Sequence, residues 1–312
     1  MDHAAAVDVL ASLETEKSTA GIRWLTPIAT AMLAAMSMHA QHRRGQLHDL
    51  LRVYPGCLSY ATNCGLIAIL EGRYSPPSAT GLQGRTYSAV TRLQSHHEVD
   101  ACNAVMSNLF HARFSEVNPL FMRALTKVVG ELHDNVPSHS RGTGFSSAQC
   151  YRQAGGDVIQ FAIADCGVGM LRNVRRKMPE VATDDQAIDW CLKRGHTTAG
   201  GEHDEWSQRL PEDSLFNPYP TSVTTVTSDN HHQGLGLWHL REIVDTARGG
   251  FWVASGSSQC RYMAGAETPL YDRLTPVWPG VAIEVELPIP APSAPAPLDR
   301  ARLEHLAERL GL

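Results

Sequence analysis

Apolar and polar positions alternate along the chain in patterns that predict both helices and strands. From residue 118 to residue 134, apolar side chains recur every three or four positions, which is typical of a long amphipathic helix. Residues 157–164 are almost continuously apolar and predict a buried strand that ends at Asp165. Residues 235–247 predict a second helix, because their apolar spacing is again helical and a glycine pair follows them.

The remaining patterns are shorter. Strands are expected over residues 86–93, 251–255 and 281–287, where side chains alternate as they do in a sheet. In the N-terminal third, we expect a helix that begins at Pro27, a residue suited to a first helical turn. A further helix is expected over residues 58–69, interrupted by a glycine. Helices and strands of this kind, mixed along one chain, predict an α/β fold class.

Composition narrows the class of protein. The chain has 312 residues, which at roughly 150 residues per domain suggests two domains. Hydrophobic residues make up 43% and charged residues 19%, so the chain can bury a core. Its net charge is −5 and it has no long basic run, which argues against nucleic acid or an anionic membrane surface as a partner.

Cysteine usage and the most apolar stretch both bear on location. Seven cysteines are scattered without a CxxC pair, which predicts neither a disulfide framework nor a zinc site and indicates a reducing cytoplasm. Residues 23–43 contain several polar side chains, whereas a bilayer helix needs about 20 mainly apolar residues. We therefore expect a cytoplasmic protein without a membrane partner.

The first candidate for chemistry is the pair Glu131 and Asn135, at the end of the long predicted helix. Residues four apart lie on the same face of a helix, so both side chains point toward one site. A carboxylate can orient and deprotonate a water, and an amide oxygen can join the shell of a hydrated Mg²⁺. The alternative interpretation is a solvated polar face.

Two glycine motifs follow the helix. Asp165, at a strand end, can accept a hydrogen bond from an adenine amino group, and Gly167 and Gly169 let the backbone approach a ligand closely. Gly234 and Gly236 open the second predicted helix, where free N–H groups and the helix dipole favour phosphate. Taken singly, an ordinary turn and a plain helix cap explain these motifs equally well.

Together and in this order, the three motifs resemble the N, G1 and G2 boxes of the GHKL ATP-binding fold. Gyrase-type topoisomerases, mismatch-repair ATPases, sensor histidine kinases and anti-sigma-factor serine kinases share this fold. The resemblance covers residues 118–288 and extends to His139-Ser140, to residues 144–149 and to the lid-like residues 195–198. It implies a two-layer α/β sandwich, the Bergerat fold, with a mixed sheet.

The resemblance also implies a role for each matching residue. Glu131 would be the catalytic base, Asn135 would bind Mg²⁺ and Asp165 would recognise adenine. Residues 171–233 would form a lid over ATP. The nucleotide pocket as a whole would be made by Asn135, Asp165, Gly167, Gly169, Met170, Thr197, Thr198, Gly234, Leu235, Gly236 and Leu237.

Three positions in this region stand out. Glu131 opens the N box where histidine kinases typically carry asparagine, and glutamate is usual in the hydrolysing and serine-kinase branches. Pro137 predicts that the helix kinks or ends soon after Asn135. Cys166 lies inside the G1 box, where it is either a small pocket residue or a redox-sensitive one.

The first 95 residues resemble, more loosely, the STAS-like domain that precedes such an ATPase in some bacterial regulators. The resemblance is carried by Ile22-Arg-Trp-Leu25 with Pro27, the helix to His39, residues 52–54, and Leu58 through Leu66. We therefore expect a small STAS-like α/β domain over 1–95, a GHKL domain over 96–290, and a Pro/Ala linker with a short helix over 291–312.

The predicted activity is Mg²⁺-dependent ATP binding with slow hydrolysis or phosphoryl transfer to a partner protein, in a bacterial-type signalling or regulatory role. Two alternatives remain open at this point. The chain could be a non-catalytic switch in which ATP alters the binding of a partner, or a histidine kinase core whose phosphoacceptor lies on another chain. A regulatory protein partner is expected in each case, and the chain could form a homodimer.

Overall fold

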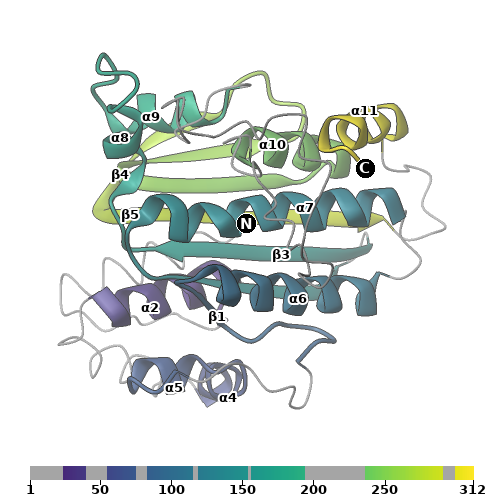
Figure 1. Cartoon of the computed structure of the whole chain (residues 1–312). Helices are drawn as coiled ribbons and strands as arrows, with labels where there is room; N and C mark the ends of the chain where they lie inside the picture. The colour runs from purple at the N-terminus through teal and green to yellow at the C-terminus, as the bar shows by residue number, and fades with distance from the viewer. Residues whose placement is uncertain are drawn as a thin grey trace, which may run out of the picture.

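A five-stranded sheet with helices on both faces forms the centre of the molecule (Figure 1). The protein is therefore α/β, as the sequence predicts. The computed structural model describes residues 24–39, 55–74, 83–114, 119–153, 156–193, 236–290 and 299–312.

All neighbouring strands in the sheet are antiparallel. Across the sheet the order is β1 (Thr91–Leu93), β2 (Gly144–Gln153), β3 (Gly156–Asp165), β5 (Leu270–Pro290) and β4 (Gly250–Met263). The expectation of a mixed sheet is thus wrong for the described strands. The physical reason is that β2–β3 and β4–β5 follow each other through short connections, which join antiparallel strands and cannot join parallel ones.

Most helices lie on the first face of the sheet. They are α6 (His96–Arg113), α7 (Pro119–Asn135), α10 (Gly236–Ala247) and α11 (Arg300–Leu310), with α8 (Gly169–Val174) and α9 (Asp184–Cys191) at one end (Figure 1). Alternate side chains of the central strands point into this core, among them Phe161 and Ile163 of β3 and Val285 of β5. Such alternation places one set of side chains on each face of the sheet.

The second face is covered by a helix rich in small residues. Helix α2 (Pro27–His39) contacts β2 and β3. Helix α5 (Leu66–Leu70) packs against α2, and α4 (Pro55–Asn63) packs against α5. The sheet presents small side chains here, such as Ala162 and Ala282, so the helix can approach closely. Helices therefore lie on both faces, and the molecule has three layers at this point where the Bergerat resemblance implies two.

The described part of residues 1–95 is built into the same sheet and core as the rest of the chain. Strand β1 pairs with β2, with Thr91 opposite Ser146, and α2 buries the second face of the sheet. The boundary expected at residue 95 thus falls between β1 and α6, inside continuous packing. The STAS-like resemblance itself stays a prediction.

The strongest periodic patterns identify their elements well. The structure confirms the helices expected over 118–134 and 235–247 and the strand expected over 157–164, each within two residues. The strand expected over 86–93 shortens to β1. Before β1, the backbone of Tyr87 makes isolated β-bridges to Gln149 and Gln83. Within the described residues, no helix is long and apolar enough to span a bilayer.

Candidate functional site

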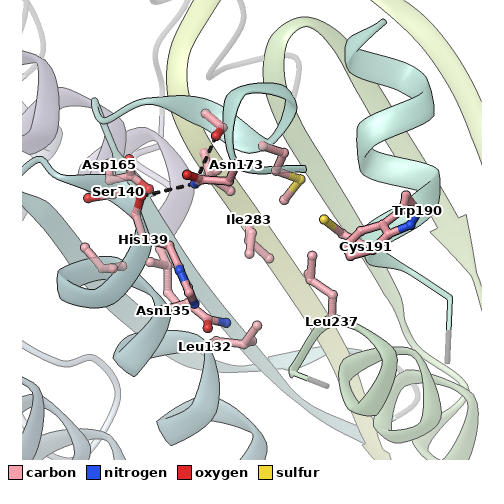
Figure 2. Close-up of a pocket in the computed structure, with 15 residues that line it drawn as sticks. Leu132, Asn135, His139, Ser140, Asp165, Asn173, Trp190, Cys191, Leu237 and Ile283 are labelled. Carbon is pink, nitrogen blue, oxygen red and sulfur yellow. Dashed lines mark hydrogen bonds between the residues drawn. The ribbon is translucent and has the colours of Figure 1, made fainter. Parts of the chain in front are cut away.

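A cavity lies where α7, the end of β3, α8, α9 and α10 meet (Figure 2). Its empty space is about 790 Å³, part of it open to solvent. Figure 2 shows Asp165 and Ser140 on one wall and Trp190 and Cys191 on the opposite wall. The full lining consists of Leu132, Asn135, Val136, His139, Ser140, Ile163, Asp165, Gly169, Met170, Asn173, Trp190, Cys191, Leu237, Val281 and Ile283.

Five of the residues expected in a nucleotide pocket line this one cavity. They are Asn135 from α7, Asp165 from the end of β3, Gly169 and Met170 from the start of α8, and Leu237 from the first turn of α10. Their motifs are far apart in the sequence, so it is the packing of α7 and α10 on the sheet that brings them together. The structure therefore joins one residue or more from each of the three motifs.

Asp165 is a buried carboxyl group in the cavity wall. Its side chain is only 3% exposed, and Oδ1 accepts a hydrogen bond of 2.7 Å from the backbone N–H of Gly167. Burial raises the pKa of Asp165 to about 7, although hydrogen bonds from the N–H groups of Gly167 and Val281 act in the opposite direction. The group therefore changes its charge near neutral pH.

The backbone around Asp165 is too closely packed for side chains. A Cβ on Gly167 would lie 2.0 Å from the carbonyl oxygen of Ser140, so only glycine fits there. Gly169 has a φ of 71°, a left-handed conformation that glycine adopts without strain. The two glycines that the sequence singles out after Asp165 thus allow the close turn from β3 into α8.

Glu131 lies one helical turn before Asn135 and outside the lining of the cavity. Its Oε2 accepts a hydrogen bond of 2.8 Å from Nδ1 of His239, a buried residue of α10. Gly236, at the start of α10, lies beside both N-box side chains: a Cβ there would be 3.3 Å from Nδ2 of Asn135 and 3.5 Å from Cβ of Glu131. The side chain of Glu131 therefore lies in the contact between α7 and the first turn of α10.

A buried histidine fixes the last turns of α7 against its neighbours. Nδ1 of His133 lies 2.6 Å from Oδ1 of Asn103 on α6, and its Nε2 lies 2.8 Å from Oγ of Ser146 on β2. Complete burial lowers the pKa of His133 to about 3, so the imidazole is neutral. This network sets the orientation of the helix that presents Glu131 and Asn135.

Ten of the fifteen lining residues are not among the predicted ligand-binding residues; His139, Asn173, Trp190 and Cys191 are four of these ten. Asn173 donates from Nδ2 to the carbonyl oxygens of His139, at 3.1 Å, and Gly169, at 3.3 Å (Figure 2). It thereby ties α8 to the π-helical turn Val136–Ser140. Two sequence signals point to this turn: the GHKL resemblance includes His139-Ser140, and Pro137 predicts the end of α7 correctly, since that helix stops at Asn135.

The predicted lid is described only in its first part. Residues 171–193 are not an irregular cover: they include most of α8 and all of α9, and α9 contributes Trp190 and Cys191 to the cavity. The rest of the predicted lid lies outside the described residues. So do Thr197, Thr198, Gly234 and Leu235.

The donor groups near the cavity fit only one kind of metal binding. Among the described residues, no group of three or more His, Cys, Asp or Glu side chains could hold a metal ion. Asn135 does bring an amide group to the cavity. Mg²⁺ in nucleotide sites keeps several waters and takes one or two protein ligands beside the phosphates. The residues therefore fit a magnesium ion that arrives with phosphates, and not an all-protein cage.

Comparison of the chain with protein-family models, curated proteins and solved structures finds no match. Function is therefore inferred from the cavity itself, from its burial, its hydrogen bonds and its chemical groups.

Proposed function

We propose that the cavity binds ATP with Mg²⁺, in the manner of a GHKL site, and that the chain slowly hydrolyses ATP or transfers its γ-phosphoryl group to a partner protein. The observation that carries the proposal is the convergence of Asn135, Asp165 and Leu237 on one cavity. Each comes from a different motif, and the GHKL resemblance implies that these three motifs share one nucleotide.

The space between Asp165 and the opposite wall suits a purine base. Ile283, Met170 and Trp190 supply apolar surface for the faces of the ring, and the buried carboxyl of Asp165 supplies a hydrogen-bond acceptor at its edge. An adenine amino group is a donor and matches this acceptor, whereas guanine presents a carbonyl oxygen at the same ring position. The cavity should therefore prefer ATP to GTP.

The opposite side of the site suits the phosphates. Helix α10 begins at Gly236, and the N-terminus of a helix carries free N–H groups and a partial positive charge. Asn135 lies next to this end and would contribute its amide oxygen to the magnesium shell. Bound Mg²⁺ would supply the charge that neutralises the phosphate oxygens.

Glu131 is the proposed general base for hydrolysis. In this step the oxygen of a water forms a bond to the γ-phosphorus while its proton passes to the Glu131 carboxylate. The bond from the γ-phosphorus to the β–γ bridging oxygen breaks, and its electron pair leaves with ADP. A carboxylate in this role contributes about 10²- to 10⁴-fold to the rate. Transfer to a protein would replace the water by a side chain of the partner.

A regulatory role in a reducing cytoplasm is part of the same proposal. None of the seven cysteines forms a disulfide, which agrees with a reducing compartment. The partner would be a protein that either accepts the phosphoryl group or responds to the bound nucleotide.

Calorimetry with ATP and GTP in the presence of Mg²⁺ tests the proposal. The wild type should bind ATP more tightly than GTP. Asp165→Asn should weaken ATP by about 5- to 150-fold, or roughly 1–3 kcal/mol. The amide has one acceptor oxygen, which the Gly167 N–H takes, so an N–H donor then faces the adenine amino group. Asp272→Asn is the matched control, since Asp272 pairs with Arg261 on the surface.

Equal binding of the two nucleotides, or an equal loss in both variants, would contradict the assignment of Asp165. Turnover is measured separately with γ-labelled ATP, followed both as free phosphate and as labelled protein. Label on free phosphate indicates hydrolysis, and label on protein indicates phosphoryl transfer.

A further inference from the structure

We propose that His239 is a positioning residue for Glu131: it fixes one carboxylate oxygen of the base and leaves the other to take the proton of the attacking water. The inference rests on the proposed function, because it assigns how the base of that site is held. Nothing in the three motifs points to His239, which follows the glycine that opens α10 by three residues.

The geometry gives the two carboxylate oxygens of Glu131 different roles. Nδ1 of His239 lies 2.8 Å from Oε2 of Glu131, a distance typical of a charge-assisted hydrogen bond. An ionised carboxylate can only accept, so the proton lies on Nδ1 of the imidazole. The Glu131 carboxylate makes no other hydrogen bond to a described residue, so Oε1 remains available to a water.

Burial makes the histidine a rigid support. The side chain of His239 is 5% exposed, whereas that of Glu131 is 19% exposed. The imidazole ring also lies against the indole of Trp238, with 5.2 Å between the ring centroids. A glutamate has three rotatable bonds, and a hydrogen bond from a fixed ring removes most of that freedom. Glu131 thus has one carboxylate oxygen bound to a buried partner, while its side chain as a whole is partly exposed.

The same contact couples the base to the proposed phosphate end of the site. His239 and Gly236 belong to the first turn of α10, and Gly236 packs against Glu131 and Asn135. The helix N-terminus that would hold the γ-phosphate therefore also orients the base. In the hydrolysis step the proton moves from the water to Oε1. The hydrogen bond from the Nδ1–H group of His239 to Oε2 stays intact throughout.

Substitutions at position 239 separate orientation from packing. Asn places an N–H donor close to the position of Nδ1, whereas Leu fills the buried space without a donor. His239→Leu should lower kcat about 10- to 100-fold, the range expected when a reacting group is displaced, with KM and the ATP dissociation constant within about twofold of wild type. His239→Asn should retain most of kcat. His97→Leu, at an exposed position of α6, is the control.

Two further measurements test whether His239 acts through Glu131. Glu131→Gln and the double variant with His239→Leu should be equally slow, because the histidine acts only through the glutamate. Long-range ¹⁵N–¹H spectra of the ATP-free protein should show the proton of His239 on Nδ1 in wild type and a shift toward Nε2 in Glu131→Ala. This spectroscopic result does not depend on catalysis.

The possible failures are distinguishable. If wild type does not bind ATP in calorimetry, the proposed function is wrong and the role of His239 falls with it. If wild type hydrolyses ATP and His239→Leu does so at the same rate, or if His239→Asn is as slow as His239→Leu, only the inference about His239 is wrong. ATP binding without any turnover also overturns this inference, while the nucleotide site stands.

Discussion

Asp165 is the residue at which stability and proposed function conflict most directly. The strand β3 ends there, and the cavity wall buries its carboxyl group almost completely. Water would solvate the ionised form better than the protein does, although the N–H of Gly167 compensates in part. A neutral residue would avoid this cost to the fold, and the carboxyl group has a role only in the proposed binding of a ligand that donates a hydrogen bond to it.

This conflict predicts a pH-dependent stability. The pKa of Asp165 is raised from 3.8 to about 7, so the folded state holds the proton more tightly than the unfolded state. The resulting stabilisation is complete below pH 4 and is lost as the pH rises through 7. Asp165→Asn removes the charge at every pH. Relative to wild type, the variant should therefore gain about 3 kcal/mol of stability between pH 4.5 and pH 8.

Urea unfolding of both proteins at the two pH values measures this difference. All other titrating groups are common to the two chains and cancel in the comparison. A stability difference that does not change with pH would show that the carboxyl group is solvated, and it would remove the argument from burial.

At the scale of single elements, a glycine inside α7 and a glycine in the turn after β3 have opposite effects on stability. Gly130 lies inside this helix, where a Cβ would make an ordinary contact of 3.5 Å with Asn103. Gly130→Ala should stabilise the protein by about 0.5–1 kcal/mol, because alanine favours helix more than glycine does. Gly167→Ala should destabilise it by about 1–3 kcal/mol, because its Cβ would overlap the Ser140 carbonyl oxygen.

Thermal unfolding of the two variants and wild type measures both changes in stability, the gain expected for Gly130→Ala and the loss expected for Gly167→Ala. A loss of stability in Gly130→Ala would mean that α7 packs more tightly on α6 than the structure shows. A neutral Gly167→Ala would mean that the turn after β3 can relax, and that glycine is not required there.

The elements that carry the site were also those that the sequence predicts best. Helix α7 and strand β3 have strongly periodic apolar residues, and α10 is bounded by glycines, so each signal is local and strong. Asn135 and Asp165 were identified because they stand at the ends of such elements. Residues at ends of regular elements are the ones that sequence patterns locate most directly.

The remaining part of the site could not be predicted for physical reasons. Trp190 and Cys191 reach the cavity only because α9 packs against β4, a contact between segments distant in sequence. His239 resembles any other buried helical position until α7 is placed opposite it. Strand β4 continues to Met263 beyond its apolar part through a bulge near Gly256, where pairing with β5 outweighs the weak local pattern.

At the scale of the whole molecule, the sheet separates two hydrophobic cores. One contains α6, α7, α10 and α11, and the cavity lies at its edge. The other is formed by α2, α4 and α5 against the opposite face of the same strands (Figure 1). Because each central strand contributes alternate side chains to both cores, neither core can form fully without the other.

A division of the chain at the boundary that the sequence suggests tests this interdependence. A fragment of residues 96–312 would lack α2 and β1 and would expose Phe145, Trp252 and Trp278, which are completely buried in the full chain. Such a large apolar patch predicts aggregation and binding of a hydrophobic dye. Co-expression with residues 1–95 should restore a soluble complex and suppress dye binding, because the second face is covered again.

The contrary outcome is a fragment that unfolds cooperatively on its own, with the same midpoint temperature of thermal unfolding as the full chain. The N-terminal segment would then be an independent domain. In that case the contacts of α2 with β2 and β3 contribute little to stability.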